Sequence, residues 1–90
     1  MTLLTLYCAP GCPRCQAARR RLERLIGEMA PPRPGLRVVD VVTALDEAVA
    51  AGVLQTPALV AEGRLLASPL PGDRALGRLL ASLPAGEERE

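Results

Sequence analysis

The chain has 90 residues, of which 49% are hydrophobic, which suits one compact domain and is too small for two separate cores. The formal net charge is only +1 and the chain has one tyrosine as its sole aromatic residue, so neither bulk charge nor base stacking favours a nucleic-acid partner. No apolar run approaches the roughly 20 residues of a membrane helix, and the first seven residues lack the features of an export signal. We therefore expect a cytoplasmic protein with no membrane partner.

The first half of the chain predicts a β-α-β unit. Residues 2–7 are apolar on both faces, as in a central strand that helices cover. From Pro13 onward, apolar residues recur every three or four positions between arginines, which indicates an amphipathic helix. The run Arg19–Arg21 falls on its polar face, which we interpret as solvated. A proline-rich connector follows, and the β-branched stretch 36–42 predicts a second, parallel strand.

The second half predicts a short helix, a hairpin and a final helix. Thr43 is placed to cap a helix that runs to Ala51. Residues 57–60 and 64–67 flank a Glu62-Gly63 turn, which is typical of two antiparallel strands. The apolar spacing from residue 74 to 83 indicates the last helix.

The predicted order is thus β-α-β-α-β-β-α, an α/β fold with a four-stranded mixed sheet and helices on both faces. The domain spans residues 2–83, and residues 84–90 form a polar C-terminal tail that we expect to be frayed.

The three cysteines lie within eight positions, so disulfides between them cannot cross-link distant segments of the chain. Their clustering indicates a reactive site instead of a structural disulfide framework. Cys12 falls where a strand turns into a helix, and the helix dipole favours a thiolate there. Cys15 lies about one turn further in, on the apolar stripe, and is the natural resolving thiol. Between them, Pro13 stiffens the turn and Arg14 adds a permanent positive charge.

Two stretches carry a family resemblance. The stretch 6–15, Leu-Tyr-Cys-Ala-Pro-Gly-Cys-Pro-Arg-Cys, resembles the first strand and active-site loop of glutaredoxins, and the stretch 52–60 resembles the cis-proline strand of the thioredoxin superfamily. Taken with the whole order of elements, the resemblance covers roughly residues 2–83 and implies a thioredoxin fold. The resemblance implies that Cys12 and Cys15 are catalytic, and that Pro13, Arg14, Thr56 and Pro57 contribute to substrate binding.

The same resemblance implies a function. A small dithiol protein of this kind reduces disulfides in protein or small-molecule substrates by thiol exchange, without a cofactor. A flavoprotein reductase or glutathione would then reduce the oxidised cysteine pair. The Thr56-Pro57 bond would be cis and face the two thiols, and the backbone of Thr56 would offer hydrogen bonds to the substrate. We expect the protein to act as a monomer.

The sequence also departs from the family pattern. Ala9 stands where glutathione-using glutaredoxins usually carry a basic residue, and Gly72-Asp73 is a late, imperfect substitute for their Gly-Gly-x-Asp stretch. Gly11 replaces the tryptophan of thioredoxins, and Leu6 occupies the place of their buried carboxylate. These departures favour a subgroup with reduced dependence on glutathione.

The sequence leaves three points open. The clustered cysteines could instead bind a metal or an iron-sulfur cluster, although the chain has no histidine and only Cys8 as a third thiolate. Cys8 is interpreted as a small buried hydrophobic residue that is dispensable for exchange, with an added redox role as the alternative. Pro57 could also be an ordinary trans proline in a turn.

Overall fold

Four strands and three helices make up the part of the chain, residues 2–83, that a computed structural model describes. In chain order they are β1 (Leu3–Cys8), α1 (Pro13–Gly27), β2 (Gly35–Asp40), α2 (Leu45–Ala50), β3 (Ala58–Ala61), β4 (Arg64–Ala67) and α3 (Asp73–Ala81). The predicted order of elements is confirmed. The predicted tail, residues 84–90, lies outside the described residues.

The strands form one mixed sheet in the order β2-β1-β3-β4. β1 pairs with β2 in parallel and with β3 antiparallel, and β3 pairs antiparallel with β4. The β3–β4 turn carries positive φ angles at Glu62 (52°) and Gly63 (79°), as a tight hairpin between twisted strands requires. β1 is therefore a central strand, which explains why its residues are apolar on both faces.

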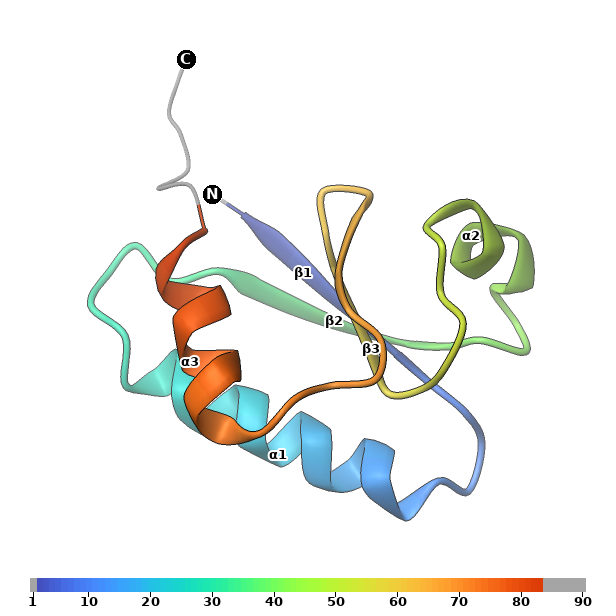
Figure 1. The fold of residues 1–90 in the computed structure, drawn as a ribbon, viewed down its shortest axis with the longest axis horizontal. Helices are drawn as coiled ribbons and strands as arrows, with labels where there is room; N and C mark the ends of the chain where they lie inside the picture. The colour runs from blue at the N-terminus through green and yellow to red at the C-terminus, as the bar shows by residue number, and fades with distance from the viewer. Residues whose placement is uncertain (1, 84–90) are drawn as a thin grey trace.

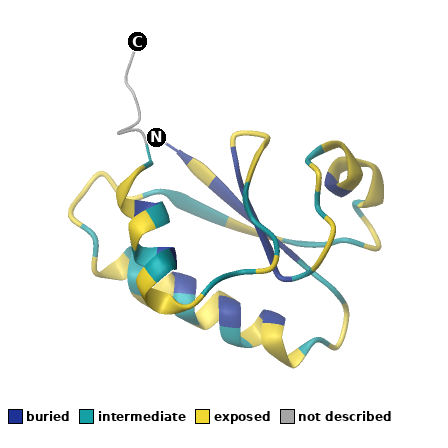
Figure 2. Ribbon diagram, in the orientation of Figure 1, coloured by how far each residue is buried: buried dark blue, intermediate teal, exposed yellow. Residues whose placement is uncertain are grey.

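Helices cover both faces of this sheet. Alternate residues of a strand point to opposite faces. In β1, Leu4 and Leu6 accordingly join the core cluster that includes Leu22 of α1 and Leu76 of α3, whereas Tyr7 joins a second cluster with α2. Figure 1 shows α1 and α3 together, with α2 across the strands from α1, and Figure 2 shows the buried positions concentrated on the central strands and the inner sides of α1 and α3. Within residues 2–83, no helix has the length and apolar character needed to cross a bilayer.

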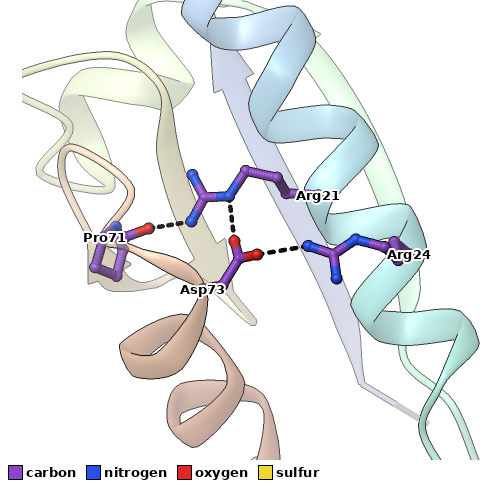
Figure 3. Close-up of polar contacts among 4 residues, drawn as sticks. All are labelled: Arg21, Arg24, Pro71 and Asp73. Carbon is purple, nitrogen blue, oxygen red and sulfur yellow. Dashed lines mark hydrogen bonds and ion pairs between the residues drawn. The ribbon is translucent and has the colours of Figure 1, made fainter.

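An ion-pair cluster fastens α1 to the start of α3 (Figure 3). The Asp73 carboxylate lies 2.5 Å from Nε of Arg21 and 2.5 Å from an Nη of Arg24, and Arg21 also donates to the carbonyl oxygen of Pro71. The two guanidinium groups, Arg21 first, hold the pKa of Asp73 below its ordinary value. Asp73 is also in the first turn of α3, where the helix dipole favours an acidic group. The cluster therefore fixes how α3 sits against the helix that carries the cysteine pair.

A second polar cluster holds α2 on the other face. The buried Tyr7 hydroxyl donates to the Glu47 carboxylate at 2.5 Å, and Arg37 of β2 forms an ion pair with the same carboxylate. Burial and the negative charge of Glu47 raise the pKa of Tyr7. The phenol therefore stays protonated and remains a donor to α2.

The prediction for the start of α2 is wrong in one respect. Thr43 does not cap the helix, since α2 begins at Leu45 after Ala44 and has no side-chain cap. The Asp40 carboxylate accepts the Val42 amide hydrogen at 2.7 Å, and the Thr43 hydroxyl donates to the Asp40 carbonyl at 3.1 Å. Asp and Thr often form such local bonds with the backbone. Here these bonds end β2 two residues before the predicted Val42 and make a turn that delays the helix.

Candidate active site

The loop between β1 and α1 places Cys12 at the first turn of the helix. Gly11 takes a positive φ of 66°, a conformation that residues with a side chain rarely adopt. Cys12 follows as the N-cap in an extended conformation, and Pro13 starts the helix, where no amide hydrogen is needed. The amide hydrogens of Cys15 and Gln16 reach the Cys12 carbonyl at 3.1 and 3.3 Å. The Cys12 thiol thus lies at the N-terminus of α1, where the helix dipole favours a thiolate.

All three cysteines line one pocket of about 140 Å³, and all three are free thiols. Cys15 is buried, with 4% of its surface exposed, whereas Cys8 and Cys12 are half-buried. The remaining lining residues are Ala9, Gly11, Gln16, Arg19 and Val38. The difference in exposure between Cys12 and Cys15 matches the expected difference between an attacking and a resolving thiol.

The surroundings of Cys12 favour its thiolate. Its pKa is lowered first by a hydrogen bond from the Cys15 thiol, next by the Cys15 amide, and then by the amide and guanidinium of Arg14. Partial burial acts in the opposite direction and is outweighed. A thiolate is the form of cysteine that attacks disulfides. Cys12 is therefore the best nucleophile that the pocket offers.

Cys8 has the opposite environment. Burial, followed by its hydrogen bond to Cys15 and the charges of the other two cysteines, raises the pKa of Cys8 to about 12, against a smaller opposing effect of Arg19. Cys8 is the last residue of β1 and packs against the core cluster under α1. Cys8 is therefore a protonated thiol that lines the same pocket as Cys15.

Thr56 and Pro57 lie at the entrance to β3. Their peptide bond is cis, and Pro57 is buried while Thr56 is half-buried. Tyr7 pairs with Ala58, so the antiparallel register puts Pro57 across from Cys8 at the end of β1. The Pro57 carbonyl accepts the Leu70 amide hydrogen at 2.8 Å. The sheet thus brings Pro57 to the edge where the thiols lie.

Thr56 lines a different hollow from the thiols. It closes an apolar groove of about 200 Å³ between α2 and the segment that leads to β3. The other lining residues are Val41, Leu45, Ala48, Val49, Val53, Leu54 and Gln55. Three of these are largely exposed, with Leu54 at 89%, Val49 at 66% and Leu45 at 58%. The groove therefore presents apolar side chains to solvent next to Thr56.

One residue of the pocket was missed from the sequence. Arg19 is exposed, as its place on the polar face of α1 predicts, but it also lines the thiol pocket and lowers the pKa of Cys8. It also forms an exposed ion pair with Glu23 at 3.3 Å. Its position four residues after Cys15 on the same helix was the available signal, because such residues share one face.

The described part of the chain offers no preformed metal centre. Among residues 2–83, no group of three or more histidine, cysteine or acidic side chains has an arrangement that could hold a metal ion. The three thiols share a pocket, but nothing in their geometry favours the metal-binding or cluster-binding alternative.

The sheet order, the helices on both faces and the cysteine pair at the start of α1 define an α/β protein of thioredoxin fold. A probable thioredoxin from Archaeoglobus fulgidus is 30% identical to the chain over 91 residues, which cover 98% of this chain and 96% of that protein. The chain belongs to the thioredoxin family. No family model matches it.

Solved structures agree with this assignment. A variant thioredoxin from Halobacterium salinarum NRC-1 superimposes with a TM-score of 0.73 at 25% identity, covering 99% of this chain and 78% of that one. Oxidised mitochondrial thioredoxin 3 from Saccharomyces cerevisiae gives a TM-score of 0.72 at 25% identity, covering 91% and 78%. The predicted thioredoxin fold is confirmed.

Proposed function

We propose that the protein is a thiol-disulfide oxidoreductase in which Cys12 attacks the substrate and Cys15 resolves the intermediate. The observation that carries the proposal is the position of Cys12 as the N-cap of α1, in one pocket with the buried Cys15 thiol. The lowered pKa of Cys12 supports it. Membership of the thioredoxin family supports the same chemistry.

The reaction has two exchange steps. The Cys12 thiolate attacks one sulfur of the substrate disulfide, forms a mixed disulfide and releases the other sulfur as a thiolate. Cys15 then loses its proton and attacks the Cys12 sulfur, which frees the second substrate thiolate and leaves a Cys12–Cys15 disulfide. Two electrons pass to the substrate, and an external reductant returns the pair to the dithiol form.

We propose a disulfide-bearing protein segment as the substrate. The apolar groove beside Thr56 favours this class, because exposed apolar surface of this kind usually marks a site of association with another protein. In this proposal the backbone of Thr56 binds the segment next to its disulfide. Pro57, Pro13 and Arg14 contact the substrate around Cys12.

The loop that carries Thr56 is held in place by Ser68. The Ser68 hydroxyl accepts a hydrogen bond from the Gln55 amide at 3.0 Å and donates one to the Gln55 carbonyl at 2.8 Å.

The reductant is proposed to be a flavoprotein reductase in preference to glutathione. Gly72-Asp73 is only an imperfect match to the Gly-Gly-x-Asp stretch of glutathione-using glutaredoxins, and the Asp73 carboxylate is already paired with Arg21 and Arg24. A glutathione amino group would have to compete with both guanidinium groups.

Insulin reduction tests the proposal. The purified protein is assayed with NADPH and a flavoprotein thioredoxin reductase, and in parallel with glutathione and glutathione reductase. We expect turnover in the first system, little in the second, and none with either Cys12→Ser or Cys15→Ser. If the wild-type protein fails to reduce insulin in both systems, the proposed function is wrong.

A further inference from the structure

The thiol pocket has a positively charged wall. Besides the cysteines, its lining includes Val38 of β2 and both Gln16 and Arg19 of α1. Among the described residues that line the pocket, Arg19 is the one cation, and none is acidic. The exchange chemistry proposed above uses the two cysteines of α1 and leaves Arg19 without a role.

Arg19 can exchange its present partner at little cost. Its ion pair with Glu23 has an N–O distance of 3.3 Å, and both side chains are more than half exposed. Exposed pairs of this kind contribute little to stability, because water screens the charges and both side chains lose rotational freedom. Glu23 is therefore a weak competitor for the guanidinium, and a carboxylate that enters the pocket can replace it.

The pocket and the apolar groove beside Thr56 lie on opposite sides of β1, the strand that leads to Cys12. In the sheet, β1 has β2 on one side and β3 on the other. Val38 of the pocket belongs to β2, whereas Thr56 of the groove precedes β3. A polypeptide bound across Cys12 therefore has residues near the apolar groove on one side of its disulfide and residues near Arg19 on the other.

We propose that the thiol pocket selects protein substrates in which an acidic residue lies next to the reactive disulfide, and that the Arg19 guanidinium binds the carboxylate of that residue. This inference rests on the function proposed above and names the substrate class of the same site. The pocket, at about 140 Å³, has room for a side chain. Arginine offers parallel N–H donors that match the two oxygens of a carboxylate.

The charged groups around the pocket permit an acidic substrate. Asp40 lies two residues beyond Val38 on β2, but its carboxylate accepts the Val42 amide hydrogen at 2.7 Å and does not line the pocket. Arg14, between the two active-site cysteines, is a second exposed cation near Cys12. The Cys12 thiolate repels a negative substrate, and the two guanidinium groups oppose this repulsion.

The test compares three short peptides that differ only beside their single cysteine, which is flanked by glutamate, glutamine or lysine. The cysteine sulfur is joined to 2-thiopyridine as a mixed disulfide. The Cys12 thiolate attacks the peptide sulfur, and the neutral 2-thiopyridone that leaves is followed by its absorbance. Each rate constant is divided by that of dithiothreitol with the same peptide, which removes differences in intrinsic reactivity. We expect the glutamate peptide to react about three- to fivefold faster than the glutamine peptide, and the lysine peptide to be slowest.

Variants of α1 locate the source of this preference. Arg19→Gln should abolish the preference for glutamate, and Arg19→Lys should keep most of it. Arg20→Gln is the matched control and should keep the full preference, because Arg20 is the exposed neighbour of Arg19 and does not line the pocket. Since the preference compares two peptides on one protein, any change in the reactivity of Cys12 itself cancels.

Equal rates for the glutamate and glutamine peptides with the wild-type protein would overturn the inference. So would an equal loss of preference in Arg19→Gln and Arg20→Gln, since that indicates the general charge of α1 and not a pocket. Equal peptide rates in a protein that reduces insulin refute the substrate preference alone. Release of 2-thiopyridone no faster than with an ordinary thiol refutes the proposed function and this inference together.

Discussion

The apolar groove beside Thr56 makes a prediction about protein substrates. Leu54 is 89% exposed in the free protein, so nearly all of its side chain is available for burial by a partner. Burial of an exposed leucine contributes about 1.5–3 kcal/mol, so a substrate that covers half of it gains about 1 kcal/mol, or roughly fivefold in kcat/KM. Leu54→Asp also places a charge against an apolar partner. We therefore expect a five- to tenfold fall in kcat/KM, on the order of 1 kcal/mol.

The assay compares insulin with a small aromatic disulfide that does not reach the groove. Leu54→Asp should slow insulin reduction and leave reduction of the small disulfide within about twofold of wild type, a difference under 0.5 kcal/mol. Ala30→Asp is the matched control, because it adds the same charge at an exposed position beyond the far end of α1, roughly 20 Å along the helix from Cys12. Equal losses for both substrates, or no loss with insulin, would refute the role of the groove.

Three further predictions follow from the site and the core. Because the pKa of Cys12 is lowered, its alkylation rate should stay near its maximum at a pH below that at which an ordinary thiol ionises, and should decrease as the pH drops through the lowered pKa. Arg14→Ala should shift this decrease in rate to higher pH, and an unchanged pH profile would contradict the electrostatic account. Leu22 is fully buried, so Leu22→Ala should lower the free energy of unfolding, measured in urea, by about 3 kcal/mol. Arg20 is exposed, so Arg20→Ala should change that free energy by less than about 0.5 kcal/mol. A loss under about 1 kcal/mol for Leu22→Ala would mean that α1 does not pack on the core as described. Cys8 lies at the end of β1, outside the Cys12–Cys15 pair, so Cys8→Ser should retain most of the insulin-reducing activity; loss of that activity in a folded variant would show that Cys8 takes part in the exchange.

Local sequence was enough to predict the element order and the cysteine pair. The helix that begins at Pro13 has a proline where no amide hydrogen is needed and an apolar stripe through Cys15 and Leu22. Local helix propensity and core packing therefore both favour a helix at this position. The same agreement holds for the hairpin at Glu62 and Gly63. These features depend on residues within one or two turns of each other, which is why a single sequence reveals them.

Features that depend on distant residues could not be predicted. The pocket that Cys8 shares with Cys15 requires the packing of α1 against β1, and the contact of Arg21 with Asp73 joins positions 52 residues apart. The start of α2 was misplaced for a different reason. The Asp40 carboxylate and carbonyl bond to the Val42 amide hydrogen and the Thr43 hydroxyl, and these bonds form a turn in place of the first helical residues. The preference of Thr43 for a helix N-cap does not reveal this competition.

Selective alkylation tests the central claim, that Cys12 is the attacking thiol, most directly. The reduced protein is treated with less than one equivalent of iodoacetamide at mildly acidic pH and then digested with trypsin. Cleavage after Arg14 separates Cys15 from the peptide that holds Cys8 and Cys12, and fragmentation of that peptide distinguishes these two. The lowered pKa of Cys12 predicts that the label falls on Cys12 first. Label appearing first on Cys15 or Cys8 would contradict the assignment of roles, even with the fold unchanged.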